Sequence, residues 1–311
     1  MFNKTINKIL SKDVNTRQNQ YNIIIIMILR GGGIICSFLL IPLMLRYLDK
    51  NDFGIWLTLT SITSWISFMD IGLGNGLRNK LTEANTLNNK TLAVEYVSTT
   101  YGIFSLVVII LIFSFAIINP FINWAAILKT KLNHIDILIL TYTVIISFCV
   151  RLILDLAGVI VISLHKPYIK SIIDFITNFL ILLVAYLLAI IPYHSFVLFG
   201  LALSVTPVIL LVIFTVILFR KQSVFFYLKP SVKFFKKKHL KSLLNLGLQF
   251  FLIQISALIV FSTDNILITQ LYSPADVTRF NISYKLFSII TIIFNIILIP
   301  YWSSFTSEYI K

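Results

Sequence analysis

The segment "FMDIGLGNGLRNKLTEA", Phe68–Ala84, decides the fold because its three glycines at alternate positions fit either a phosphate-binding loop or a membrane exit. A dinucleotide-binding loop needs G-x-G-x-x-G after a short strand, but Leu77 occupies the third glycine position. The preceding apolar stretch begins near Phe53 and is too long for a strand. A P-loop is excluded too, since the last glycine is followed directly by Leu77 and Arg78 and not by a Lys-Ser or Lys-Thr pair. The segment is therefore interpreted as the place where the chain leaves a membrane.

The composition supports this interpretation. The chain has 311 residues, of which 58% are hydrophobic and 12% are charged, and its mean hydropathy is +0.92. Soluble domains average about 45–50% apolar and about 25% charged residues. The sequence therefore predicts an all-α polytopic membrane protein. The net charge of +14 lies in short clusters between apolar runs, which indicates topology signals and excludes a nucleic-acid-binding face.

Eight apolar runs are long enough to cross a bilayer. They lie at roughly 23–45, 54–74, 97–118, 137–163, 170–191, 196–219, 243–269 and 283–305. With the amino terminus in the cytoplasm, eighteen of the 26 lysines and arginines fall in cytoplasmic segments and six in outer ones. Because positive charge concentrates in cytoplasmic loops, we expect a multi-pass protein with a cytoplasmic amino terminus.

The basic segment Arg220–Lys241 divides the chain and is interpreted as a topology anchor on the inner leaflet. We expect an amino-terminal bundle of six spans over 1–219, with an amphipathic inner-leaflet helix near 76–96. A basic linker follows at 220–242, and 243–311 holds the first two spans of a second bundle. "LDKNDFGIW" (Leu48–Trp56) and "YSPADVTRF" (Tyr272–Phe280) match at an offset of 224 residues, which predicts two related halves.

The motif residues of the membrane exit have expected roles. Glycine lets helices approach closely, and basic residues anchor at the cytoplasmic headgroups. The residues concerned are Asp70, Gly72, Gly74, Asn75, Gly76 and Arg78. The tryptophans, including Trp56 and Trp124, fall mainly near span ends, which is typical of an interfacial aromatic belt.

The segment "DIGLGNGLRNKLTEA" resembles the one that follows the second transmembrane helix in polysaccharide flippases of the O-antigen (Wzx) type. These belong to the multidrug/oligosaccharidyl-lipid/polysaccharide exporter superfamily. "LRYLDKNDFGIWLTLTSI" and "STDNILITQLYSPADVTRFNISYKL" support the resemblance, which covers essentially the whole chain in order. It implies two six-helix bundles around a central cavity. It also implies flipping of an undecaprenyl-pyrophosphate-linked oligosaccharide across the bacterial inner membrane. The family has about twelve spans whereas eight are found here, so most of the second bundle is expected to be missing, because the sequence is either a fragment or the product of a truncated gene.

Charged and polar residues inside spans are the candidate substrate-binding residues, because a charge at the bilayer centre costs about 2.5–3.5 kcal/mol and usually faces a cavity or partner. They are Arg30, Arg151, Asp155, Asp264 and Asn265, with Asp174 as a further candidate. Arg30 could bind the pyrophosphate or snorkel to the interface. Arg151 and Asp155, four residues apart, share a helix face and form either an internal salt bridge or a cavity-lining pair.

Three classes of function remain open, and the transporter class is favoured over an enzyme. A flippase suits arginines inside spans, whereas a drug or cation exporter of the same superfamily suits an acidic cavity. A membrane enzyme of polysaccharide assembly is less favoured, because no histidine has an aspartate five residues on and the outer loops are short. No Cys/His spacing predicts a metal, and no cofactor is expected. The expected partners are the lipid-linked glycan, the bilayer, and a polysaccharide polymerase with its chain-length partner.

Overall fold

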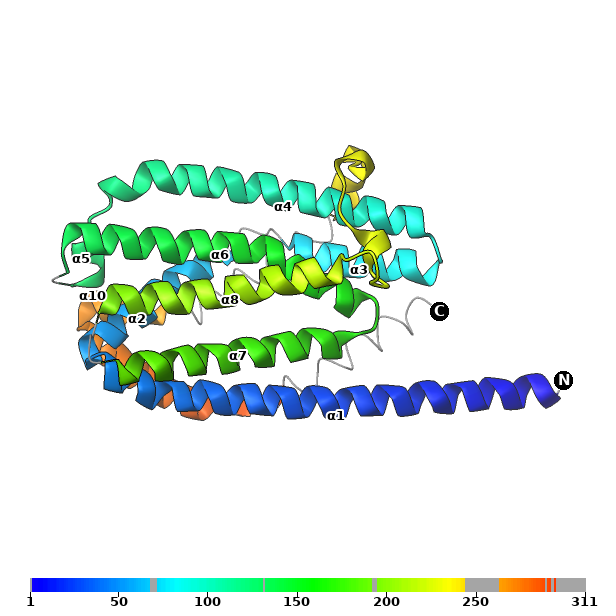
Figure 1. Cartoon of the computed structure of the whole chain (residues 1–311), viewed down its shortest axis with the longest axis horizontal. Helices are drawn as coiled ribbons and strands as arrows, with labels where there is room; N and C mark the ends of the chain where they lie inside the picture. The colour runs from blue at the N-terminus through cyan, green and yellow to red at the C-terminus, as the bar shows by residue number, and fades with distance from the viewer. Residues whose placement is uncertain are drawn as a thin grey trace.

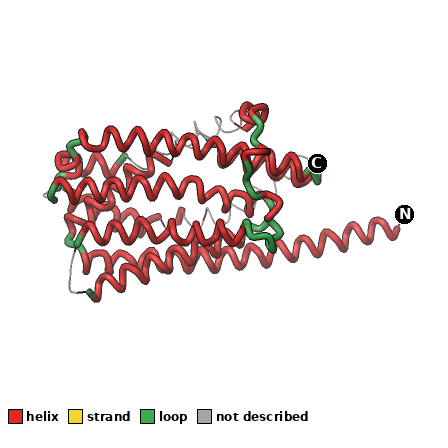
Figure 2. The backbone as a smooth tube through the Cα atoms, turned by 45° about the horizontal axis from the view of Figure 1, so that its top comes forward, coloured by secondary structure: helices red, strands yellow, loops and turns green. Residues whose placement is uncertain are grey.

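The computed structural model describes residues 2–67, 72–130, 132–191, 195–243, 263–288, 290–291 and 294, and describes side chains from residue 24 on, except those of 64–67. The long helices are α1 (Phe2–Tyr47), α2 (Lys50–Ser67), α3 (Leu73–Thr86), α4 (Lys90–Ile118), α6 (His134–Ser163), α7 (Pro167–Ile190) and α8 (Phe196–Leu218). The shorter ones are α5 (Trp124–Leu128), α10 (Asp264–Leu271) and the 3-10 turns η2 (Asn119–Phe121), η3 (Phe226–Leu228), η4 (Val232–Phe234) and η5 (Lys237–His239). Residues 274–288 are also helical. The described residues contain no strand, as Figure 2 shows, so the all-α prediction is confirmed.

Five of the predicted spans are confirmed as helices long and apolar enough to cross a membrane. They are Ile24–Tyr47, Lys90–Phe121, His134–Ser163, Pro167–Ile190 and Phe196–Leu218. In Figure 1 these helices run side by side along the longest axis of the molecule. α2 lies in the same bundle where the second span is predicted. Most of the predicted seventh and eighth spans lie outside the described residues.

The two ends of the bundle are formed by different elements of the chain. At one end α5, α10 and the start of α2 lie together, and at the other end lie α3 and the basic linker (Figure 1). Two hydrophobic clusters fill the bundle. One joins α3, α4, α6 and α8 near the α3 end, and the other joins α1, α2, α5, α6, α7 and α8 near the opposite end. We call the end with α3 and the basic linker the inner end, because the charge distribution predicts that basic segments lie in the cytoplasm. We call the opposite end, with α5 and α10, the outer end.

The predicted amphipathic helix near 76–96 is divided in the structure. α3 ends at Thr86, Asn88 adopts a left-handed φ of 52°, and the Asn89 side chain accepts a hydrogen bond from the Leu92 amide at 3.0 Å. Asparagine tolerates this backbone conformation and is a preferred N-cap, so residues from Lys90 on begin α4. The apolar face of α3 packs on α4 and α6 rather than on lipid.

The prediction that Trp56 and Trp124 belong to an interfacial belt is wrong, because both side chains are buried in the outer-end cluster. Trp56 packs edge-on against the ring of Phe199. The indole Nε1 of Trp124 donates to Asn119 Oδ1 at 2.6 Å. The Asn119 amide in turn lies 3.3 Å from Thr141 Oγ1 and is fully buried. A buried tryptophan needs such a partner for its N–H.

Asn119→Ala is expected to lower the melting temperature of the detergent-purified protein. The substitution removes the acceptor of the buried Trp124 indole, and an unsatisfied buried donor costs about 1–3 kcal/mol. Asn133→Ala is the control, because Asn133 is exposed and its side chain makes no cap hydrogen bond to α6. Equal melting temperatures for the two variants would contradict this role for Asn119.

Candidate functional site

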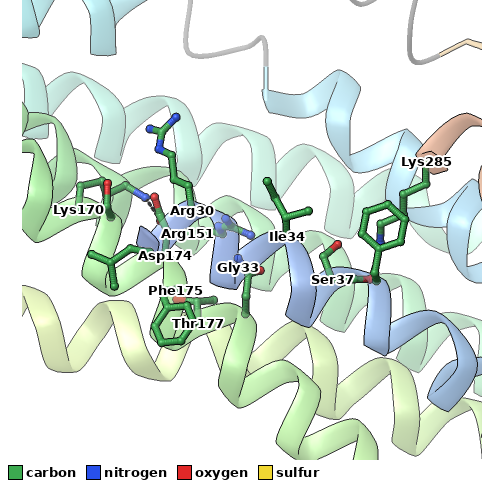
Figure 3. A pocket seen from close by; sticks show the side chains of 14 residues that line it. Arg30, Gly33, Ile34, Ser37, Arg151, Lys170, Asp174, Phe175, Thr177 and Lys285 are labelled. Carbon is green, nitrogen blue, oxygen red and sulfur yellow. Dashed lines mark hydrogen bonds and ion pairs between the residues drawn. The ribbon is translucent and has the colours of Figure 1, made fainter. Parts of the chain in front are cut away.

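A cavity of about 570 Å³ lies between α1, α6, α7 and the helical residues 274–288. Four cationic side chains line it, together with one carboxylate and several polar and aromatic groups. The charged residues are Arg30, Arg151, Lys170, Lys285 and Asp174. Figure 3 shows Arg30, Arg151, Lys170 and Asp174 gathered at one end of the cavity. Lys285, from the helix over 274–288, lies at the other end. The structure thus brings together two predicted site residues and Asp174.

Arg30 reaches this cavity because α1 and α7 approach each other closely just beyond it. A Cβ on Gly32 would lie 2.7 Å from the ring of Phe175, and one on Gly33 would lie 3.0 Å from the Asn178 amide nitrogen. Glycine provides the space that this approach requires. Among the residues that the structure describes, Arg30 makes no ion pair with a carboxylate.

Arg151 and Asp155 form the predicted pair, with Arg151 Nε donating to Asp155 Oδ2 at 3.3 Å. The pair extends into a network, because Lys170 Nζ lies 3.6 Å from the second oxygen of Asp155 and also donates to Asp174. The Arg151 side chain remains 45% exposed. The pair is a salt bridge, and of its two members Arg151 lines the cavity whereas Asp155 does not.

In the charge count, Lys170 falls among the cytoplasmic loop cations and Lys285 among the outer ones, but both side chains line the cavity. Lys170 lies in the first turn of α7 and points into the charged network. Lys285 Nζ donates to the Ser37 carbonyl of α1 at 2.7 Å and lies 5.6 Å from the centroid of the Phe38 ring. The signal for Lys285 was its position inside the predicted eighth span.

A second cavity of about 370 Å³ continues from the first toward the outer end and shares Ser37 and Lys285 with it. Asn281 lines this second cavity. Its amide donates to Asn265 Oδ1 at 2.6 Å, and the Asn265 amide donates to Ser61 Oγ at 2.6 Å. Asn265 therefore reaches the second cavity only through Asn281, and the neighbouring Asp264 lines neither cavity.

The glycine-rich motif does not line the cavities either, although Asp70 lies outside the described residues. Gly72 has a left-handed φ of 68° and caps the start of α3, which contains Gly74, Asn75, Gly76 and Arg78. A Cβ on Gly76 would overlap the Leu243 carbonyl oxygen. Burial lowers the pKa of the Arg78 guanidinium. The motif therefore builds a packed corner at the inner end.

At the outer end the two sequence-related segments contact each other. Thr278 Oγ1 donates to the Lys50 carbonyl at 2.8 Å, and a Cβ on Gly54 would overlap the Pro274 carbonyl oxygen. Lys50 and Pro274 are equivalent at the offset of 224 residues, and so are Gly54 and Thr278. The two contacts are therefore reciprocal, as a local two-fold relation produces.

Further polar contacts close the outer end around this pair of segments. The hydroxyls of Thr58 and Thr269 lie 2.7 Å apart and are fully buried. Lys129 Nζ donates to the carbonyls of Gln270 and Tyr272 at 2.8 and 3.2 Å. The structure is therefore closed at the outer end around α2, α5 and α10.

Comparisons with known proteins agree with this architecture. No family model matches the sequence. The chain is 22% identical over 263 residues to a Salmonella typhimurium protein named "Putative O-antigen transporter", covering 84% of this chain and 59% of that protein. The chain thus spans less than two thirds of the length of this curated relative.

Solved transporter structures share the fold. An inward-facing multidrug resistance MATE family transporter of the MOP superfamily has a TM-score of 0.67 at 13% identity, covering 85% of this chain and 60% of that one. The MATE multidrug transporter DinF-BH has a TM-score of 0.71 at 15% identity, covering 89% of this chain and 61% of that one. The chain is therefore a multi-pass α-helical membrane protein that shares its fold with these transporters.

Proposed function

We propose that the protein carries an undecaprenyl-pyrophosphate-linked oligosaccharide from the cytoplasmic to the outer face of the bacterial inner membrane. The observation that carries the proposal is the positive charge of the cavity of about 570 Å³. Arg30, Arg151, Lys170 and Lys285 line it, and Asp155 and Asp174 are the carboxylates that pair with them. Cations thus outnumber carboxylates by two, which suits an anionic ligand rather than a cation.

The four cationic residues have different roles in binding a pyrophosphate. The planar guanidinium groups of Arg30 and Arg151 suit bidentate hydrogen bonds to phosphate oxygens. Lys170 is already shared by two carboxylates, so it positions Asp155 and through it Arg151. Lys285 belongs to the helix over 274–288, so a ligand that attracts it would connect the two halves of the chain.

The transport step follows from the closed outer end. A head group enters the cationic cavity from the cytoplasm while its lipid tail remains in the bilayer. Opening of the contacts around Gly54 and closure of the inner end then expose the sugar on the other side, as in alternating access. In this proposal, residues 1–219 form the amino-terminal bundle, 220–242 form the linker, and 243–311 begin a second bundle. The amino terminus lies in the cytoplasm. A polysaccharide polymerase and its chain-length partner receive the exported glycan.

A drug or cation exporter is the second candidate, because multidrug transporters share the fold. Deletion of the gene separates the two functions. We expect lipid-linked repeat units to accumulate inside the cell and surface polysaccharide to fall, measured by extraction of lipid-linked glycans. Normal surface polysaccharide in a strain without a redundant flippase, together with increased sensitivity to a cationic dye, would contradict the proposal and support the exporter.

A further inference from the structure

The basic linker, residues 220–242, is fastened to one side of α4. Its backbone amides at Ser231 and Lys236 donate to the Ser98 and Thr99 hydroxyls at 3.2 and 3.1 Å. His239 Nε2 lies 2.7 Å from Glu95 Oε2, and both side chains are largely buried. In Figure 1 the linker, in yellow, lies over the inner end of α4. The linker is therefore a docked element with a defined outer surface.

The side of α4 that carries the linker continues as its most exposed apolar stripe. Glu95, Thr99 and Gly102 recur at helical spacing, and a Cβ on Gly102 would lie 2.8 Å from the Phe235 ring of the linker. The same face continues with the exposed side chains of Leu106, Ile109, Phe113 and Ile117. An exposed apolar stripe on a membrane-spanning helix faces lipid.

The linker therefore lies at the level of the lipid headgroups. Leu106 begins the exposed stripe one turn after Gly102, a rise of about 6 Å along the helix axis. The linker covers α4 on the inner side of that point, where the hydrocarbon layer gives way to headgroups. The linker lies beside α4, and none of its residues lines the 570 Å³ cavity.

The outer surface of the linker is strongly cationic. Its basic residues are all exposed: Arg220, Lys221, Lys229, Lys233, Lys236, Lys237, Lys238 and Lys241. No acidic residue occurs between 220 and 242. Among the ion pairs that the structure describes, one involves these residues, that of Lys238 with Glu95 at 3.7 Å. The remaining charge therefore faces outward without a protein carboxylate.

Apolar side chains interrupt this charge on the same surface. Val232 is 92% exposed and Val224 is 74% exposed, and Phe234, which follows Lys233, is exposed as well. Phe225 and Leu228 are buried instead and hold the linker in place. Alternation of cations with outward apolar side chains is typical of a segment that lies in the membrane interface.

We propose that the linker is a binding site for the anionic phospholipids of the inner leaflet. Its lysines contact the phosphate headgroups, and Val232 and Phe234 enter the boundary with the acyl chains. An acidic protein or a nucleic acid would satisfy the charge, but neither would explain the apolar side chains beside the lipid-facing stripe of α4. Because juxtamembrane lysines attract anionic lipid, the occupancy of this site depends on the lipid composition.

The test is a fluorescent probe on Val232→Cys in the full chain. The protein is placed in nanodiscs of phosphatidylcholine with increasing phosphatidylglycerol. We expect a blue-shifted emission and quenching by a shallow spin-labelled lipid only when phosphatidylglycerol is present. Lys229→Gln/Lys233→Gln is expected to weaken binding to phosphatidylglycerol by roughly thirtyfold, because each lysine contributes about 1 kcal/mol near an anionic surface and every 1.4 kcal/mol is tenfold in affinity.

Arg46→Gln/Lys50→Gln is the matched control, since it removes two exposed charges at the outer end. This control should leave the lipid response unchanged. A probe that remains quenchable by aqueous iodide at every lipid composition would overturn the proposal. A larger response to polyglutamate or DNA in discs without phosphatidylglycerol would overturn it as well, in favour of a macromolecular partner. The readout does not involve transport, so its outcome is independent of the proposed function.

Discussion

Arg30→Gln/Arg151→Gln is expected to reduce export of the lipid-linked glycan by more than a hundredfold. The double substitution leaves Lys170 and Lys285 opposite Asp155 and Asp174, so the excess of cations in the cavity disappears. Each charge-assisted hydrogen bond is worth about 1.5–3 kcal/mol. Loss of two therefore corresponds to roughly a hundredfold or more in affinity. The measurement is the ratio of exported to intracellular lipid-linked glycan in a strain without its own copy of the gene.

Two further variants make this result specific. Arg46→Gln/Lys50→Gln removes the same charge from exposed positions at the outer end and should leave export unchanged. Arg151→Ala should impair export more than Arg30→Lys, because Arg151→Ala also leaves Asp155 with Lys170 alone, whereas the lysine keeps a cation. If the double variant is correctly inserted and exports like the wild type, these arginines do not hold the substrate.

The bundle could be predicted from the sequence because its helices are defined by local properties. α4, α6, α7 and α8 are long apolar runs bounded by polar residues, and length alone identifies such spans. The boundary at Asn88 could not be predicted in the same way. Apolar positions at helical spacing continue across it, and the chain is interrupted only by a left-handed backbone conformation.

The candidate site was predictable only where its geometry is local. Arg151 and Asp155 lie four residues apart on one helix, so their pairing follows from spacing alone. Lys170 and Lys285 reach the same cavity from different helices, and their positions depend on how α7 and residues 274–288 pack on α1. Which helices pack against each other depends on the tertiary fold and cannot be deduced from the sequence of either helix alone. In the sequence, both lysines look like loop cations near the end of a span.

The two sequence-related segments show again that tertiary contacts could not be predicted from the sequence. The match between Leu48–Trp56 and Tyr272–Phe280 rests on few identical residues. The structure adds that these segments meet through reciprocal contacts, Gly54 against Pro274 and Thr278 against Lys50. Reciprocity requires that both segments have the same local geometry. Sequence spacing predicted the relation between the halves but not that its two copies close the outer end.

Gly54→Ala is expected to prevent this closure and to abolish export. An added Cβ would overlap the Pro274 carbonyl oxygen, and backbone cannot move aside as a flexible side chain does. Overpacking of this kind costs about 3 kcal/mol. That cost falls on the outer-closed state alone, so it shifts the equilibrium toward the outer-open state by roughly a hundredfold. The substrate would then lack the inward-facing cavity in which it binds.

Crosslinking measures this shift directly. Cysteines at Lys129 and Tyr272, both exposed and in contact in the closed state, should be joined by a short bismaleimide in the wild-type background and not with Gly54→Ala. Gly31→Ala is the matched control, because a Cβ there meets nothing within 4 Å, and it should preserve both crosslinking and export. If Gly54→Ala crosslinks and exports normally, the contact with Pro274 is not part of the closed state used in transport. Loss of export with normal crosslinking would instead place the defect inside the cavity, because the outer end would still close.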